Sequence, residues 1–187
     1  MCTNVTNRFQ TFLARYLCPD VCVDSVTDID PESLRQKGFT TLLLDLDNTL
    51  LSWKAEEMSA TTLEWIRKAK ISGLKLLIVS NSFQNRVNRL SKALEVPAIS
   101  RAVKPRKSVF LEALRLLGSL AKETAVIGDQ LFTDILGGKR LGLYTILVSP
   151  VDKQEFFATE LVRIPEKMVL NLFQKKGLLK SEGPKYF

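Results

Sequence analysis

Histidine is absent from the 187-residue chain. Its absence excludes the Ser–His–Asp triad, the Cys–His pair, histidine phosphatases and every zinc or iron site that has a histidine ligand. The composition is otherwise that of an ordinary globular protein, with 45% hydrophobic and 25% charged residues. Any catalysis must therefore depend on carboxylates, lysine, hydroxyl groups or a hard metal ion.

Cysteine is scarce as well. Cys2, Cys18 and Cys22 form no CxxC motif and are too few for a four-cysteine metal site. We therefore expect a reducing compartment. Cys2 and Arg8 have the C-x5-R spacing of thiolate phosphatases, whose cysteine lies in a phosphate-binding loop between a strand and a helix. Cys2 follows the initiator methionine and its loop contains no glycine, so we reject this interpretation.

Long apolar runs are also missing. No stretch of about 18 apolar residues predicts a membrane span, and the N-terminus lacks the features of a secretory signal. Apolar residues recur at helical spacing between Phe9 and Leu17, which we interpret as a helix docked on the domain; an organellar presequence and a helix lying on a membrane surface are the alternatives. We expect a protein of the cytoplasm or of an organellar matrix or stroma, neither secreted nor membrane-spanning, with peripheral membrane association left open.

Strand and helix patterns alternate along the chain. We predict strands at 41–45, 74–80, 98–100, 124–128 and 144–148. Helices are predicted at 59–72, 83–94, 106–117 and 133–141, with a short helix at 31–38 before this core and another at 165–176 after it. Such alternation predicts a Rossmann-like α/β fold, in which a parallel, doubly wound sheet has helices on both faces. The chain is predicted to be one domain, with its core at about residues 39–150.

Polar side chains follow the predicted strands at the points where they end. The first strand ends in residues 45–49 and the second in residues 80–82, while Lys104 comes just before the next helix. Asp129 ends the fourth strand and Asp134 follows five residues later. Ligands of doubly wound sheets bind at the carboxyl ends of the strands. We therefore expect these groups to meet in one crevice.

Such a crevice would hold up to four carboxylates. Carboxylates this close together repel one another, which raises their pKa values strongly unless a cation neutralises them. Without histidine or cysteine ligands, the fitting cation is hard and oxygen-loving, which indicates Mg2+. This arrangement suits phosphoryl transfer, with one aspartate as nucleophile and a second as general acid and base. Each motif alone could simply cap a turn or a helix, but their joint occurrence favours a catalytic site.

Four motifs carry a resemblance to a known family. They are Asp-Leu-Asp-Asn-Thr-Leu from residue 45, Val-Ser-Asn-Ser from 79, Ala-Val-Lys-Pro from 102 and Ile-Gly-Asp-Gln-Leu-Phe-Thr-Asp from 127. These segments resemble the four motifs of the haloacid dehalogenase (HAD) phosphatases, and within them the YqeG-type branch of subfamily IIIA. The resemblance implies a HAD core with a minimal cap or none.

The resemblance also implies roles for the first motif. Asp45 would be the nucleophile that forms an aspartyl-phosphate, and its carboxylate would also contact Mg2+. Asp47 would be the general acid and base, with its backbone carbonyl on the metal. Thr49 would hold the Asp47 side chain in position.

The other motifs would bind phosphate and metal. By the same resemblance, Ser80 hydrogen-bonds the phosphoryl oxygen, Asn81 orients the phosphate and Lys104 balances its charge. Asp129 would bind Mg2+ directly. Asp134 would bind it either directly or through water.

The spacing between motifs bears on the substrate. The gaps between the first three motifs hold only one or two elements each and are too short for a cap domain, so a phosphate carried by a large molecule could enter. Residues 45–150 contain sixteen basic and ten acidic residues, and much of the basic excess lies between Arg86 and Arg115, around the second and third motifs. These basic residues form either a solvated helix face or a rim of the crevice that attracts an anionic lipid or another polyanion.

The resemblance implies phosphatidylglycerophosphate phosphatase activity for some members. We therefore expect a phosphatase that converts phosphatidylglycerophosphate to phosphatidylglycerol. The alternatives are a phosphatase for phosphoproteins or soluble phosphate esters and, more remotely, a non-enzymatic phosphoacceptor domain. The last keeps its acceptor aspartate on the third strand, which here ends without an acid. No nucleic-acid partner is expected, because aromatic and basic residues are not interleaved.

Overall fold

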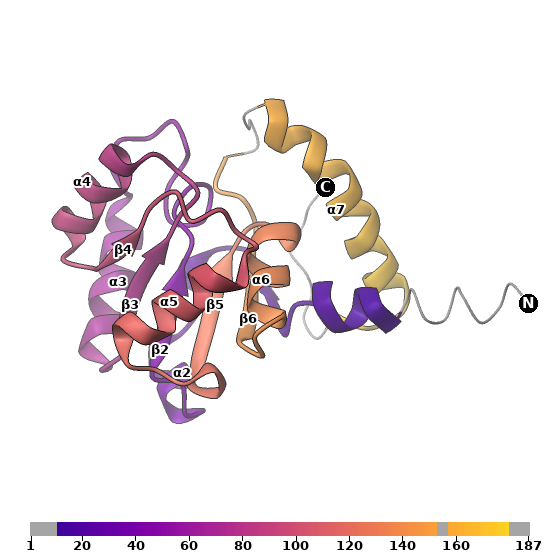
Figure 1. The fold of residues 1–187 in the computed structure, drawn as a ribbon, viewed down its shortest axis with the longest axis horizontal. Coiled ribbons are helices and arrows are strands. Elements are labelled where there is room, and N and C mark those ends of the chain that lie inside the picture. The colour runs from indigo at the N-terminus through magenta and orange to yellow at the C-terminus, as the bar shows by residue number, and fades with distance from the viewer. Residues whose placement is uncertain (1–10, 153–156, 180–187) are drawn as a thin grey trace, which may run out of the picture.

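A parallel β-sheet forms the centre of the protein in a computed structural model, which describes residues 11–152 and 157–179. The strands are β1 (Val21–Val23), β2 (Thr41–Leu44), β3 (Lys75–Val79), β4 (Ala98–Ile99), β5 (Thr124–Gly128) and β6 (Tyr144–Val148). They form one six-stranded sheet in the order β1-β6-β5-β2-β3-β4, and every neighbouring pair is parallel (Figure 1). The predicted α/β fold with a parallel sheet is confirmed.

Helices connect and cover these strands. They are α2 (Pro31–Gln36), α3 (Ala60–Ile71), α4 (Gln84–Leu94), α5 (Lys107–Leu117), α6 (Leu136–Lys139) and α7 (Phe157–Lys175). Residues 11–17 are also helical; the rest of the segment expected to form this helix lies outside the described residues, as do Cys2 and Arg8. None of the helices in the described part of the chain has the length and hydrophobicity required to span a membrane.

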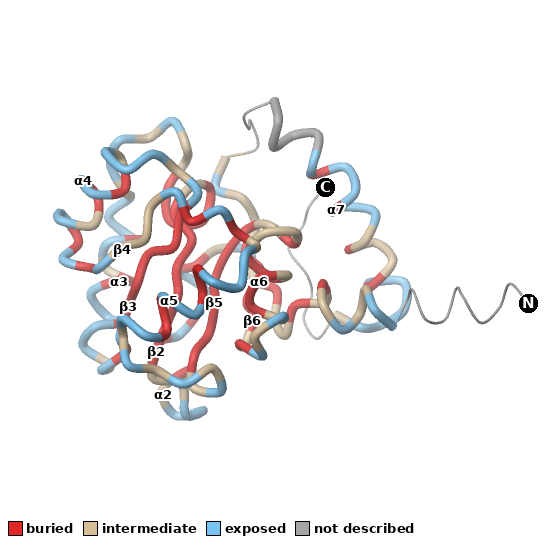
Figure 2. Tube along the Cα trace, in the orientation of Figure 1, coloured by how far each residue is buried: buried red, intermediate tan, exposed pale blue. Residues whose placement is uncertain are grey.

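Alternate residues of the central strands face opposite layers of helices. Leu42 and Leu44 of β2 pack with side chains of α3 and α4, whereas Leu43 of β2 and Leu77 of β3 pack with α5, including Phe110. In Figure 2 the buried part of the trace is concentrated in the strands between these layers. Burial on both faces explains the continuous apolar runs of β2 and β3.

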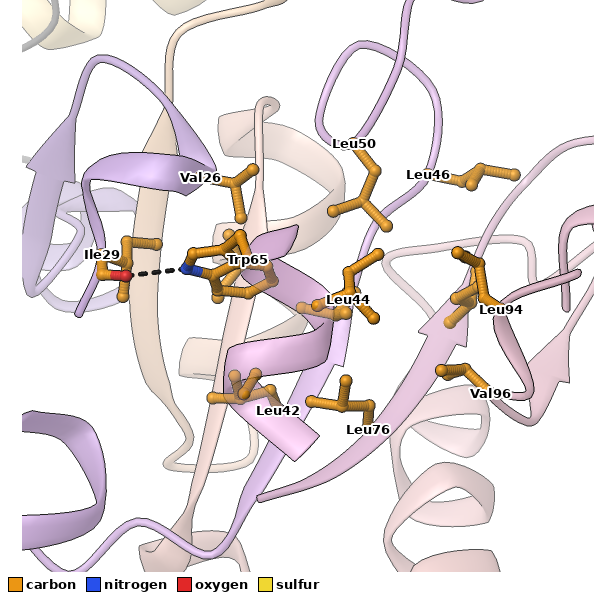
Figure 3. Close-up of a cluster of buried hydrophobic side chains, with 14 of the residues drawn as sticks. Val26, Ile29, Leu42, Leu44, Leu46, Leu50, Trp65, Leu76, Leu94 and Val96 are labelled. Atoms are coloured by element: carbon orange, nitrogen blue, oxygen red, sulfur yellow. Dashed lines mark hydrogen bonds between the residues drawn. The ribbon is translucent and has the colours of Figure 1, made fainter. Parts of the chain in front are cut away.

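Trp65 is the largest side chain of the core on the α3 side. It is 4% exposed, and its indole Nε1 donates a hydrogen bond of 2.7 Å to the carbonyl oxygen of Ile29 (Figure 3). The bond joins α3 to the segment that precedes α2. Burial of the ring and the satisfied N–H together stabilise this layer.

Three elements differ from the prediction. β1 was not expected, because only Cys22 of its three residues is buried and a strand this short has no readable alternation. The last helix begins at Phe157, so Pro165 lies inside it instead of opening it. The expected helix 133–141 consists of a π-helical turn, Leu131–Ile135, followed by α6.

The topology determines where the site lies. From β2 the chain proceeds to β3 and β4 at one edge of the sheet, then returns to place β5 on the other side of β2. A ligand crevice forms where strand order reverses in this way, beyond the carboxyl ends of the strands. Asp45 follows β2 and Asp129 follows β5, and the Asp45 N–H bonds the Ile127 carbonyl at 2.9 Å. The two aspartates therefore lie next to each other at the reversal point.

The core assignment of Trp65 predicts a stability loss. Trp65→Ala should lower the free energy of unfolding by about 3–5 kcal/mol, because it leaves a large cavity and an unpaired Ile29 carbonyl. Chemical denaturation measures the change. Leu63→Ala is the matched control, since Leu63 is 45% exposed on the same helix and its loss should cost about 0.5 kcal/mol or less. Equal losses in the two variants would contradict this packing.

Candidate active site

A pocket of about 500 Å3 opens at the carboxyl ends of the strands. Six of the eight expected site residues line it, namely Asp45, Asp47, Ser80, Asn81, Lys104 and Asp134. The other two, Thr49 and Asp129, are each 1% exposed and lie behind the pocket wall. All four motifs therefore meet at one place, as the sequence predicted.

Asp45 lies on the floor of this pocket and is held at both carboxylate oxygens. Thr49 Oγ1 donates to its Oδ2 at 2.9 Å, and Lys104 Nζ donates to its Oδ1 at 2.5 Å. Thr49 also contacts Asp129 at 3.4 Å. The family resemblance assigned Thr49 to Asp47; the structure instead places its hydroxyl between Asp45 and Asp129, because the turn that follows β2 brings residue 49 back over residue 45.

Lys104 connects two of the acids. Its side chain is 3% exposed, and Nζ donates to Asp134 Oδ1 at 2.6 Å in addition to Asp45. Burial alone would lower the pKa of Lys104, but Asp134 and Asp45 together raise it above its ordinary value. The backbone N–H of Lys104 donates a hydrogen bond to Asn81 Oδ1 at 2.8 Å. Asn81 thus positions the lysine backbone, a contact that the sequence did not predict.

Asp47 lies closer to solvent, with its side chain 22% exposed. Ser82 Oγ donates to its Oδ2, and Arg86 Nε donates to its Oδ1 at 3.0 Å. Arg86 also donates to the backbone carbonyls of Ser52 and Ala55, at 3.1 and 2.7 Å. The sequence suggested only that Arg86 belonged to a basic rim; the structure shows that it holds both Asp47 and the loop after β2.

Three carboxylates form a compact acidic cluster. One oxygen each from Asp45, Asp129 and Asp134 lies within 4.8 Å of the others. Asp134 reaches the cluster from the π-helical turn, and a Cβ on Gly128 would lie 2.3 Å from its Cγ, so only glycine fits there. Burial raises the pKa of Asp134 to about 6 and raises the pKa of Asp129 well above its usual value. The cluster therefore favours a cation.

A buried ion pair from α7 completes the site, and the sequence analysis missed it. Arg163 donates to the backbone carbonyl of Asp129 at 2.6 Å and also to its Oδ2. Glu166 accepts from Arg163 at 2.9 Å and from the Phe132 N–H at 3.1 Å. Arg163 precedes Pro165, where the helix was expected to begin, so no local pattern identified it.

The buried charges of the described residues all belong to this site. They are the carboxylates of Asp45, Asp129, Asp134 and Glu166 and the cations of Lys104 and Arg163. Four acids and two bases have a formal charge of −2, which one divalent cation would neutralise. Carboxylate oxygens without histidine or cysteine suit a hard ion. The side chain of Asp47 lies outside the acidic cluster, and only its backbone carbonyl was expected on the metal.

Comparison with known proteins identifies the family. A family model described as mitochondrial PGP phosphatase matches residues 3–152. The chain belongs to this family. A Bacillus subtilis (strain 168) protein named Probable phosphatase YqeG is 37% identical over 170 residues, which cover 91% of this chain and 99% of the relative. The chain is a HAD phosphatase of the YqeG type, as its motifs predicted.

A second relative is more distant. Phosphatidylglycerophosphate phosphatase 1, chloroplastic/mitochondrial, from Arabidopsis thaliana is 28% identical over 174 residues. The match covers 88% of this chain and 50% of the relative, so the chain spans about half the length of that protein.

Solved structures share the fold at low identity. The cobalt-bound deoxy-D-mannose-octulosonate 8-phosphate phosphatase of Haemophilus influenzae has a TM-score of 0.50 and 14% identity, over 82% of this chain and 96% of that one. A protein from Listeria monocytogenes serotype 4b has a TM-score of 0.50 and 18% identity, over 71% of this chain and 98% of that one. Both show that this α/β fold occurs in solved structures at low sequence identity.

The Arg163 contacts predict a large loss of stability. Arg163→Gln removes the cation between two buried carboxylates, and leaving buried charge without its partner costs about 3–5 kcal/mol. Denaturation in the presence of a chelator measures the unfolding free energy without any metal. Arg67→Gln is the control, because the Arg67–Glu64 pair is exposed and its loss should have little effect. A denaturation midpoint for Arg163→Gln equal to that of wild type would contradict the role of Arg163 as the partner of Asp129 and Glu166.

Proposed function

We propose that this chain is a Mg2+-dependent phosphomonoesterase that acts through an aspartyl-phosphate on Asp45. The observation that carries the proposal is the position of Asp45, which lies at the pocket floor between Lys104 and Thr49 and within 4.8 Å of two further acids. Asp45, Asp129 and Asp134 would hold the ion, with the Asp47 carbonyl. When bound, Mg2+ supplies positive charge that neutralises the phosphate dianion.

The first half-reaction transfers the phosphoryl group to the protein. A carboxylate oxygen of Asp45 attacks phosphorus, the P–O bond to the leaving alkoxide breaks, and Asp47 donates the proton that converts this alkoxide to an alcohol. Lys104 stabilises charge on the phosphoryl oxygens, and Ser80 and Asn81 orient them. Asp47 suits the acid role because it lies at the pocket mouth, where the leaving group emerges.

The second half-reaction releases phosphate. Asp47, now deprotonated, removes a proton from water, and the resulting hydroxide attacks phosphorus. The P–O bond to Asp45 breaks, which yields inorganic phosphate and regenerates the Asp45 carboxylate. Ser82 and Arg86 hold both oxygens of Asp47 and so keep the carboxylate directed at the same point in both steps.

Phosphatidylglycerophosphate is the substrate we favour. The family description and the printed name of the Arabidopsis relative support it. The pocket also supports it, because the segments from β2 to β3 and from β3 to α5 contain only α3, α4, β4 and loops, and no inserted domain covers the mouth. An open mouth lets a terminal phosphate enter while the lipid remains outside. The proposed location, the cytoplasm or an organellar interior, is compatible with such a substrate.

The nucleophile assignment predicts loss of activity on substitution. Asp45→Asn should lower phosphate release by at least about a thousand-fold, because the amide cannot form the acyl phosphate. Release is measured from phosphatidylglycerophosphate in mixed micelles and from soluble esters. Glu112→Gln, an exposed carboxylate on α5, is the control. No release by wild type from any ester would refute the enzyme proposal, and release from soluble esters or phosphoproteins alone would refute the lipid substrate.

The metal assignment predicts a thermal shift that does not depend on turnover. Mg2+ at about one hundred times its dissociation constant should stabilise wild type by about 2.7 kcal/mol and so raise the melting temperature by about 5–10 °C. Asp129→Asn should lose most of this shift, since it removes one charged ligand. The same rise in Asp129→Asn and wild type would place the ion elsewhere.

A further inference from the structure

Two exposed apolar side chains and an arginine lie in the two loops beside the pocket. Phe83, which follows β3 and borders the pocket, is 77% exposed, and Val103 in the loop after β4 is 51% exposed. The guanidinium of Arg101 lies 6.0 Å from the centroid of the Phe83 ring. The Arg101 N–H donates to the Ser82 carbonyl at 3.1 Å, so the two loops are joined beside the pocket. Apolar surface is therefore presented at the entrance itself.

The backbone that presents Val103 is unfavourable for valine. Arg101 and Val103 have φ angles of 49° and 54°, in the left-handed region that a β-branched residue rarely adopts. This conformation directs Ala102 and Lys104 inward, where they are 4% and 7% exposed. Glycine or asparagine would form the same turn at lower cost, and the outward valine gains little burial in return. A contact outside the chain would account for it.

Two basic residues that follow this loop, Arg106 and Lys107, are unfavourable for the stability of α5. Arg106 is the N-cap of α5 and Lys107 its first residue, and both side chains are exposed. The N-terminus of a helix has partial positive charge, so cations there are unfavourable in the isolated chain. The Arg106 N–H bonds the Val103 carbonyl at 3.2 Å, so Val103 and the start of α5 belong to one turn. An anionic partner would offset their repulsion.

We propose that this surface, consisting of Phe83, Arg101, Val103, Arg106 and Lys107, docks on an anionic lipid bilayer. Phe83 and Val103 insert between headgroups while the three cations contact lipid phosphates, which is the combination that interfacial membrane binding requires. A nucleic acid would use the cations but has no comparable contact for Val103. The inference rests on the proposed function, because docking would bring the open pocket onto a lipid-borne phosphate.

Vesicle co-sedimentation in a chelator tests the docking separately from catalysis. Wild type should bind phosphatidylcholine vesicles that contain phosphatidylglycerol and should not bind phosphatidylcholine alone. The triple variant Arg101→Gln, Arg106→Gln, Lys107→Gln should bind about one hundred-fold more weakly, at about five-fold per basic residue. Phe83→Ser with Val103→Asn should reduce binding at least about ten-fold; asparagine tolerates the backbone conformation at residue 103.

Matched controls exist toward the amino ends of the strands, at the opposite end of the sheet from the pocket. Ile71 is 71% exposed at the end of α3 and Arg115 is exposed in the last turn of α5, so Ile71→Ser and Arg115→Gln should leave vesicle binding unchanged. Loss of binding in these controls, or none in the surface variants, would overturn the proposal. Binding of wild type to a single-stranded DNA oligonucleotide but to no vesicle would also overturn it, in favour of a nucleic acid.

The two proposals can fail independently. Turnover of a soluble phosphate ester should be close to wild type in the triple variant, whose residues take no part in the chemistry. Wild type that binds anionic vesicles but hydrolyses no ester would refute the proposed function alone. Wild type that hydrolyses esters but does not bind anionic vesicles would refute the docking surface alone.

Discussion

Charge balance among six buried side chains is the constraint on which the rest of the structure depends. The four carboxylates and two cations come from the ends of β2 and β5, just after the last strand residue, and from the π-helical turn, the loop before α5, and α7. Each element must hold its side chain within hydrogen-bond distance of an opposite charge, because an unpaired buried ion costs several kcal/mol. The sheet, the loops and the last helix are thus positioned by the same electrostatic requirement.

The two buried cations contact different carboxylates of the cluster. Lys104 contacts Asp45 and Asp134 on the pocket side, whereas Arg163 contacts Asp129 from behind. Lysine presents a compact charge that suits the phosphate position, and arginine's planar group can bond a carboxylate and a carbonyl together. The remaining formal charge of −2 equals the charge that one divalent cation would neutralise, so the same carboxylates bear on phosphatase chemistry and on the stability of the fold.

Much of the fold and most of the site could be predicted from local sequence patterns. The apolar runs of β2, β3 and β5 and the polar residues just after them are contiguous signals, and parallel pairing brings those ends together. β1 has only one buried residue, so it carried no such signal. Arg163 and Glu166 acquire their role only when α7 packs on the fourth motif, which begins at residue 127. The contacts of Thr49 and Arg86 depend on how the loop after β2 folds back. Sequence spacing does not encode contacts of that kind.

The position of Arg163 has a consequence for protein synthesis. A nascent chain that has left the ribosome as far as β6 contains every strand of the sheet and all four motifs, but not the guanidinium that faces Asp129. In that intermediate Asp129 would be buried beside two other acids with Lys104 alone to oppose them, so it would have to hold a proton or remain hydrated. The second buried cation of the acidic cluster is therefore available only after α7 has been translated, so the charge balance of the site is completed by the last helix.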